Sequence, residues 1–128
     1  VDLHARGARV LLFRGERGRV LDAAHRALEA LAGAVPSEPE PWCNVVAWHE
    51  PAEGYSLVLF PRPKHRPESF HRGERTVSPA SIDMSGILVT PLRRDFDALT
   101  GEEVAAIYDE VSLPDEAFRA VVARLERW

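Results

Sequence analysis

The stretch that decides the fold is Trp42-Cys-Asn-Val-Val-Ala-Trp-His49, followed after Glu50-Pro-Ala-Glu-Gly54 by Tyr55-Ser-Leu-Val-Leu-Phe60. Two apolar runs separated by a short segment that contains proline and glycine predict a β-hairpin. Nearly every position of both runs is apolar, which is typical of strands covered on both faces. The sequence therefore predicts a hairpin at the centre of the domain, with other elements against both of its faces.

Further elements are predicted on either side of the hairpin. Residues 8–13 predict a short strand, and residues 19–33 predict a helix because apolar residues recur there at helical spacing. Three prolines within residues 34–41 predict an extended connector, since each proline fixes φ and removes a donor. After a polar loop over residues 61–75, residues 86–90 predict another strand that ends before a proline.

The C-terminal part of the sequence predicts two helices. Thr100-Gly-Glu-Glu103 is a capping box ahead of an apolar stripe, with Thr100 as the N-cap. Leu113-Pro114 ends this helix, and Pro114 or Asp115 begins the next. The predicted class is α+β, an antiparallel sheet of three or four strands with helices packed on one face. Such a sheet has open edges, so we expect another sheet, a second subunit or a missing half of the protein beside it.

Composition and charge exclude several classes of protein. The 128 residues are 45% hydrophobic and 28% charged, which predicts one ordered domain over residues 1–128. The net charge of −4 lacks the basic footprint of a nucleic-acid-binding protein. The single cysteine excludes an internal disulfide. No apolar run is long enough for a membrane span and no secretory signal is visible, so we expect a cytoplasmic protein with no membrane partner.

The densest basic cluster lies in Pro61-Arg-Pro-Lys-His-Arg-Pro67 and contains the only lysine of the chain. Its potential cations are Arg62, Lys64, His65 and Arg66. Arginine and lysine at such spacing suit the capture of phosphate or carboxylate groups, and the prolines stiffen the segment. The alternative is a solvated basic loop on an acidic protein. In either case these side chains are expected at the surface, where substitutions change stability little.

Two polar residues outside this loop are candidates for shaping a pocket. Asn44 interrupts an apolar strand, so its amide requires a partner, either an internal bridge to a neighbouring loop or a ligand. Asp83 lies in a serine-rich turn, where it either caps the turn or binds a hydroxyl-rich ligand. We expect both to organise structure and neither to be catalytic.

The five histidines are scattered singly, which gives no spacing for a metal site or for a paired catalytic base. His65 is the candidate acid–base group, since neighbouring cations lower the pKa of an imidazole. Its expected role is to donate a hydrogen bond to a phosphate oxygen.

Several stretches together resemble a known family. They are Asn44–Trp48, Phe60–Pro67, Ser78–Pro91, Asp95-Phe96 and Glu110–Leu113. The sequence resembles the C-terminal half of a bacterial domain family related to the histidine-triad-like nucleotidyltransferases and phosphorylases. Its relatives include galactose-1-phosphate uridylyltransferase, diadenosine tetraphosphate phosphorylase and GDP-D-glucose phosphorylase. The resemblance implies a half-barrel sheet with helices outside and a nucleotide or nucleotide-sugar ligand.

One departure from that superfamily bears on mechanism. Its catalytic signature, alternating histidines on a strand, is absent from residues 1–128. The resemblance implies that this signature lies upstream, so we expect the chain to be the C-terminal part of a longer protein. On this hypothesis it holds no catalytic residue, cofactor or metal and has no turnover alone, and a missing N-terminal half or a second subunit completes the sheet. The alternative is a non-catalytic module of the same fold that binds phosphate ligands or dimerises.

Overall fold

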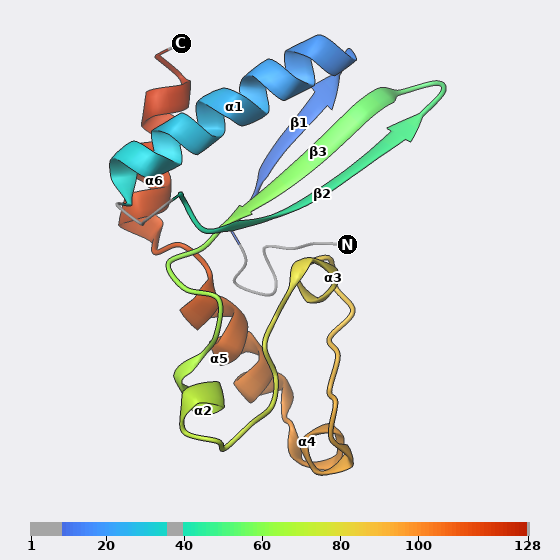
Figure 1. Ribbon diagram of the computed structural model, residues 1–128, viewed down its shortest axis with the longest axis vertical. Coiled ribbons are helices and arrows are strands. Elements are labelled where there is room, and N and C mark those ends of the chain that lie inside the picture. Colours follow the sequence, from blue (N-terminus) through green and yellow to red (C-terminus); the bar gives the residue numbers. More distant parts are fainter. Residues whose placement is uncertain (1–8, 36–39, 128) are drawn as a thin grey trace.

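The computed structural model describes residues 9–35 and 40–127 and shows an α+β fold, as predicted. Its strands form one antiparallel sheet in the order β1-β3-β2 (Figure 1). The strands are β1 (Leu11–Gly15), β2 (Cys43–Glu50) and β3 (Gly54–Pro61). The helices are α1 (Arg17–Ala34), α2 (Glu68–His71), α3 (Ser81–Met84), α4 (Arg93–Ala98), α5 (Gly101–Val111) and α6 (Asp115–Leu125). Within the described residues, none of these helices is both long and apolar enough to cross a bilayer.

The predicted hairpin is confirmed, with β2 and β3 joined by a tight turn. Asn44 lies opposite Phe60, and Glu50 opposite Gly54. Gly54 has a φ of +80°, and a Cβ there would lie 2.7 Å from the carbonyl oxygen of Gly15. Only glycine fits this position, because both the positive φ and the approach of β1 exclude a side chain.

Helices pack on both faces of the central strand β3, whereas the sequence predicted helices on one face only. Leu57 and Leu59 pack against Val20, Ala24 and Ala27 of α1. Val58 and Phe60 point the other way and form a second cluster, whose other members are Met84, Tyr108 and Val111. Helices lie on both faces because β3 carries apolar side chains on both, and neither α1 nor α5 can cover both faces alone.

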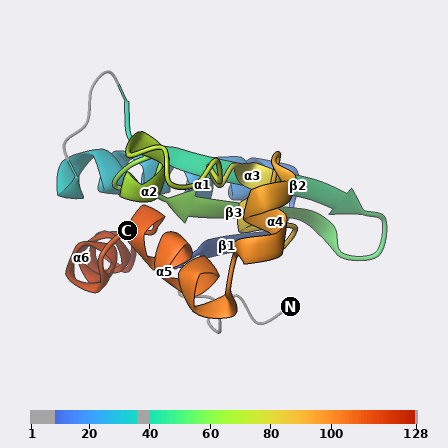
Figure 2. The same cartoon turned by 90° about the horizontal axis from the view of Figure 1, so that it is seen from below.

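The far end of the hairpin lies outside this core. Its tip projects away from the helices in both views (Figures 1 and 2). There the side chains of Trp48 and Tyr55 are exposed, whereas the other end of β3 is buried. Cover on both faces is therefore confirmed for only one half of the hairpin.

The two C-terminal helices are confirmed, including the capping box, in which Thr100 accepts from the backbone of Glu103. α6 lies beside the second half of α1, where Leu31, Leu113 and Val121 form a third cluster. The predicted N-terminal helix is α1, which begins two residues earlier than expected and is capped by the side chain of Glu16.

The strand predicted over residues 86–90 is wrong. The segment joins no sheet, because the backbone N–H of Val89 donates to the buried carboxylate of Asp83 at 2.7 Å and Gly86 adopts a φ of +113°. The short helices α2, α3 and α4 were not predicted, and α2 lies within the loop expected over residues 61–75. The first predicted strand begins later, at Leu11, and residues 36–39 of the predicted connector lie outside the described residues.

Candidate functional site

The basic loop begins with an arginine that is buried. The backbone N–H of Arg62 donates to the carbonyl of Trp42 at 2.9 Å, so the hairpin pairing continues one step past β3. The side chain of Arg62 is only 2% exposed. Its guanidinium donates to four oxygens at 2.5–3.1 Å: the side-chain oxygen of Asn44 and the carbonyls of Lys64, His65 and Pro79. Arg62 therefore fixes the course of the loop that follows it.

Arg62 keeps its charge despite this burial. Desolvation lowers the pKa of the guanidinium to about 10, and the negative charge of Asp83 opposes that shift. At neutral pH the group is therefore protonated. The expectation of a surface arginine at position 62 is wrong, because a guanidinium satisfied by carbonyls and an amide can be buried.

Asn44 and Asp83 both contact backbone or side-chain groups around this arginine. Asn44 forms the internal bridge, since its side-chain oxygen accepts from Arg62 at 2.5 Å. Asp83 is 4% exposed and accepts from the backbone N–H groups of Ala80 and Val89 at 2.8 and 2.7 Å. The bonds to Asp83 close the loop that carries α3. Both arrangements support a role in organising the strand and the turn.

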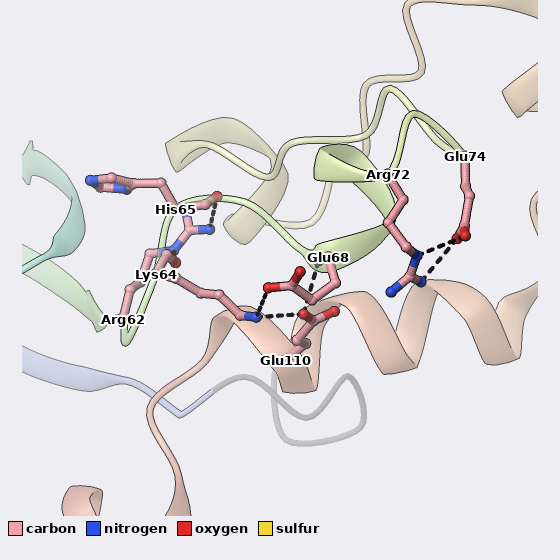
Figure 3. A network of polar contacts seen from close by, with 7 residues as sticks. All are labelled: Arg62, Lys64, His65, Glu68, Arg72, Glu74 and Glu110. Carbon is pink, nitrogen blue, oxygen red and sulfur yellow. Dashed lines mark hydrogen bonds and ion pairs between the residues drawn. The ribbon is translucent and has the colours of Figure 1, made fainter.

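The lysine of the loop points toward α5, as Figure 3 shows. Its Nζ lies 2.6 Å from Glu110 and 3.1 Å from Glu68. The hydrogen bond that Lys64 donates to Glu110 raises the pKa of Lys64, in spite of some desolvation. Glu110 also accepts from the backbone N–H of Glu68 at 2.9 Å, so it ties the loop and α2 to α5.

His65 and Arg66 are the exposed members of the cluster. The imidazole of His65 points away from α5 in Figure 3 and stacks on Trp42, with ring centroids 4.8 Å apart and planes inclined by 26°. Burial against this ring lowers the pKa of His65, and the charges of Arg62 and Arg66 lower it further. The guanidinium of Arg66 lies over the ring of Phe70, 4.4 Å from its centroid.

The four cations predicted from the sequence therefore do not gather at one point. One is buried, one is paired with two carboxylates, and two are exposed against aromatic rings. The arrangement is a rigid loop that presents an uncharged imidazole beside a charged guanidinium. Such a pair can donate hydrogen bonds to phosphate oxygens.

Some residues of the site were missed by the sequence analysis. Glu110 and Trp42 lie far from the loop in sequence. Only the register of the hairpin indicates that Trp42 lies beside the start of the loop. Asp95 is fully buried and accepts from the backbone and hydroxyl of Thr76, which lower its pKa. No three His, Cys, Asp or Glu side chains of the described ranges gather as ligands for a metal ion.

The fold and the loop define an α+β domain with a strand-anchored basic segment, and comparison with known proteins places it in a family. The chain belongs to the family described as "GDPGP1-like, C-terminal domain", whose model matches residues 8–125. This match confirms the resemblance to GDP-D-glucose phosphorylase-related proteins. Neither the curated proteins nor the solved structures give a significant match.

Proposed function

We propose that this domain is the nucleotide- or nucleotide-sugar-binding C-terminal part of a histidine-triad-like phosphorylase or nucleotidyltransferase. The observation that carries the proposal is the loop 61–67, which hydrogen bonds from Arg62 hold in place and which presents His65 and Arg66 to solvent. Membership of a phosphorylase-like family supports the choice of ligand class.

In this proposal the cations of the loop have different roles. Arg66 and His65 contact the phosphates of the ligand, with Lys64 beside them. Arg62 is a positioning residue, because its guanidinium is occupied by internal oxygens. A preformed loop loses little conformational entropy on binding, which favours affinity. The reactive histidine is proposed to lie in another part of the protein, so the domain shapes the ligand site and does not attack phosphorus itself.

Arg66→Ala is expected to weaken binding of pyrophosphate and of nucleoside diphosphate sugars by about 1–3 kcal/mol, the range for a charge-assisted hydrogen bond. Isothermal titration calorimetry measures this loss. The matched control is Arg93→Ala, since Arg93 is an exposed arginine on α4 paired with Asp97. Equal loss in both variants, or binding unchanged by Arg66→Ala, would contradict the proposal.

We further propose that a missing N-terminal half or a second copy of the chain pairs with the sheet. β1 and β2 are the edges among the described strands, and Leu12 and Val45 on them are exposed. Uncovered strand edges favour pairing with another chain.

The chain alone is expected to form a weak dimer through this sheet, and Val45→Lys is expected to shift it to monomer, because edge lysines oppose strand pairing. Sedimentation velocity over a range of concentrations measures both states. Leu21→Lys, at an exposed apolar position on α1, is the control. A monomer at every concentration would exclude the second copy and leave the N-terminal half as the proposed partner.

A further inference from the structure

A hollow of about 520 Å³ lies between the second half of α1 and the start of β2. Leu28, Ala32 and Cys43 supply apolar side chains to its lining, and Trp42 and His65 supply aromatic rings. The volume lies within the range of small-molecule sites, about 300–1,000 Å³. This hollow is therefore large enough for one planar heterocycle and part of its substituent.

The aromatic part of the lining is already arranged for stacking. Trp42 and His65 lie face to face at 4.8 Å, and Trp42 nevertheless remains 36% exposed. Since the pKa of His65 is lowered by burial and by two arginines, its ring is uncharged at neutral pH. An uncharged stacked pair with an open side is a platform on which a further flat ring gains stacking energy.

The polar groups of the hollow select the kind of ring. Glu29 and Glu40 line it, and so does His25, whose Nε2 lies 3.3 Å from a carboxylate oxygen of Glu29. Neither lysine nor arginine does so among the described residues. Carboxylates accept hydrogen bonds and repel anions. The hollow therefore suits the edge of a heterocycle that carries N–H donors, and it does not suit a phosphate group.

The phosphate-binding side chains begin where this hollow ends. His65 belongs to both, because its ring lines the hollow and its backbone is part of the loop 61–67. Arg66 follows directly and is exposed. A ligand with a flat ring against Trp42 would thus have its charged end at Arg66.

We infer that the hollow between α1 and β2 is a nucleobase subsite, which takes a purine with an exocyclic amino group while the attached phosphates lie at the loop 61–67. The inference rests on the proposed function for the position of the phosphates at the loop 61–67. Its new element is that the stacked rings of Trp42 and His65 recognise the base.

The test compares ligands that share a phosphate and differ in the base. Calorimetry with guanosine 5′-monophosphate, adenosine 5′-monophosphate and ribose 5-phosphate isolates the contribution of the ring. We expect both nucleotides to bind the full chain about tenfold more tightly than ribose 5-phosphate, which is about 1.4 kcal/mol. Trp42→Ala should remove this difference, and Trp42→Phe should keep most of it, since phenylalanine retains a flat face.

Trp48→Ala is the matched control, because Trp48 is 37% exposed and lies near the other end of β2, outside the lining of the hollow. Equal loss in Trp42→Ala and Trp48→Ala, or no difference between nucleotide and ribose 5-phosphate, would overturn the inference. If ribose 5-phosphate binds and the base adds no affinity, the nucleobase subsite is excluded while phosphate binding by the loop 61–67 is retained. Nucleosides that bind through Trp42 while pyrophosphate does not would support the subsite and contradict the phosphate loop.

A second measurement needs no substitution. Cys43 lines the hollow and is the only cysteine of the chain, so its alkylation by iodoacetamide reports on occupancy of this place. Adenosine 5′-monophosphate is expected to slow the reaction several-fold, and ribose 5-phosphate is not. An alkylation rate unchanged by a saturating nucleotide would place the base elsewhere.

Discussion

Arg62→Ala lowers the free energy of unfolding by about 3 kcal/mol or more, because it removes a buried charged group and leaves its partners behind. Four oxygens lose their donor, and the carboxylate of Asp83 loses a nearby positive charge. Hydrogen bonds to charged groups contribute about 1.5–3 kcal/mol each, although losses within one network do not add. Urea denaturation followed by circular dichroism measures the effect.

Three further variants are compared with Arg62→Ala by the same measurement of the free energy of unfolding. Arg66→Ala, four residues after Arg62 in the same loop, should stay within about 1 kcal/mol of the original protein, since a cation–π contact at an exposed site contributes no more. Asn44→Ala removes one of the partners of Arg62 and should cost about 1–3 kcal/mol. Arg62→Lys should remain destabilising, because an ammonium cannot reproduce the planar fork. An Arg62→Ala protein as stable as Arg66→Ala would contradict the structural role.

Asp83→Ala is the second substitution with a large expected effect, a loss of about 2–4 kcal/mol, since two backbone N–H groups at a buried place lose their acceptor. These are the N–H groups of Ala80 and Val89, which the carboxylate joins across α3. The loop over residues 80–89 should also become more accessible to proteases, because no sheet pairing replaces the lost bonds. Thermal unfolding and limited proteolysis provide the two readouts.

Asp83→Asn separates charge from hydrogen bonding. The amide retains one acceptor oxygen, so an intermediate stability is expected. Asp97→Ala, at an exposed carboxylate of α4, is the control and should change stability by no more than about 0.5 kcal/mol. The double variant of Arg62 and Asp83 should cost less than the two single losses together, since both residues belong to one network. Strict additivity would show that the two charges do not interact.

Elements whose cause is local were predictable from the sequence. The hairpin and the helix that begins after Thr100 depend on residues a few positions apart, and both are present. The prediction of a strand over residues 86–90 was wrong because the conformation of this segment depends on a side chain outside it. Its composition is apolar, as in a strand, but the backbone N–H of Val89 donates to the buried carboxylate of Asp83 and not to a neighbouring strand.

At the candidate site too, the sequence could not predict contacts between residues that are far apart in the chain. The composition of the basic loop predicted cations but not their partners, because Asn44, Pro79 and Glu110 come from distant parts of the chain. With Asn44 opposite Phe60 in the hairpin, Arg62 becomes a diagonal neighbour of Asn44 on the same face, which indicates a buried bridge.

The pairing of Lys64 with Glu68 and Glu110 allows the acylation of a single lysine side chain to be followed. Lys64 carries the only ε-amine of the 128 residues, and the contact that holds it joins the loop to α5. An amine must lose its proton before it acylates, so the raised pKa slows that reaction while the contact persists. The rate of acylation at this one amine therefore measures how often the loop separates from the helix, in a protein that needs no engineered reporter.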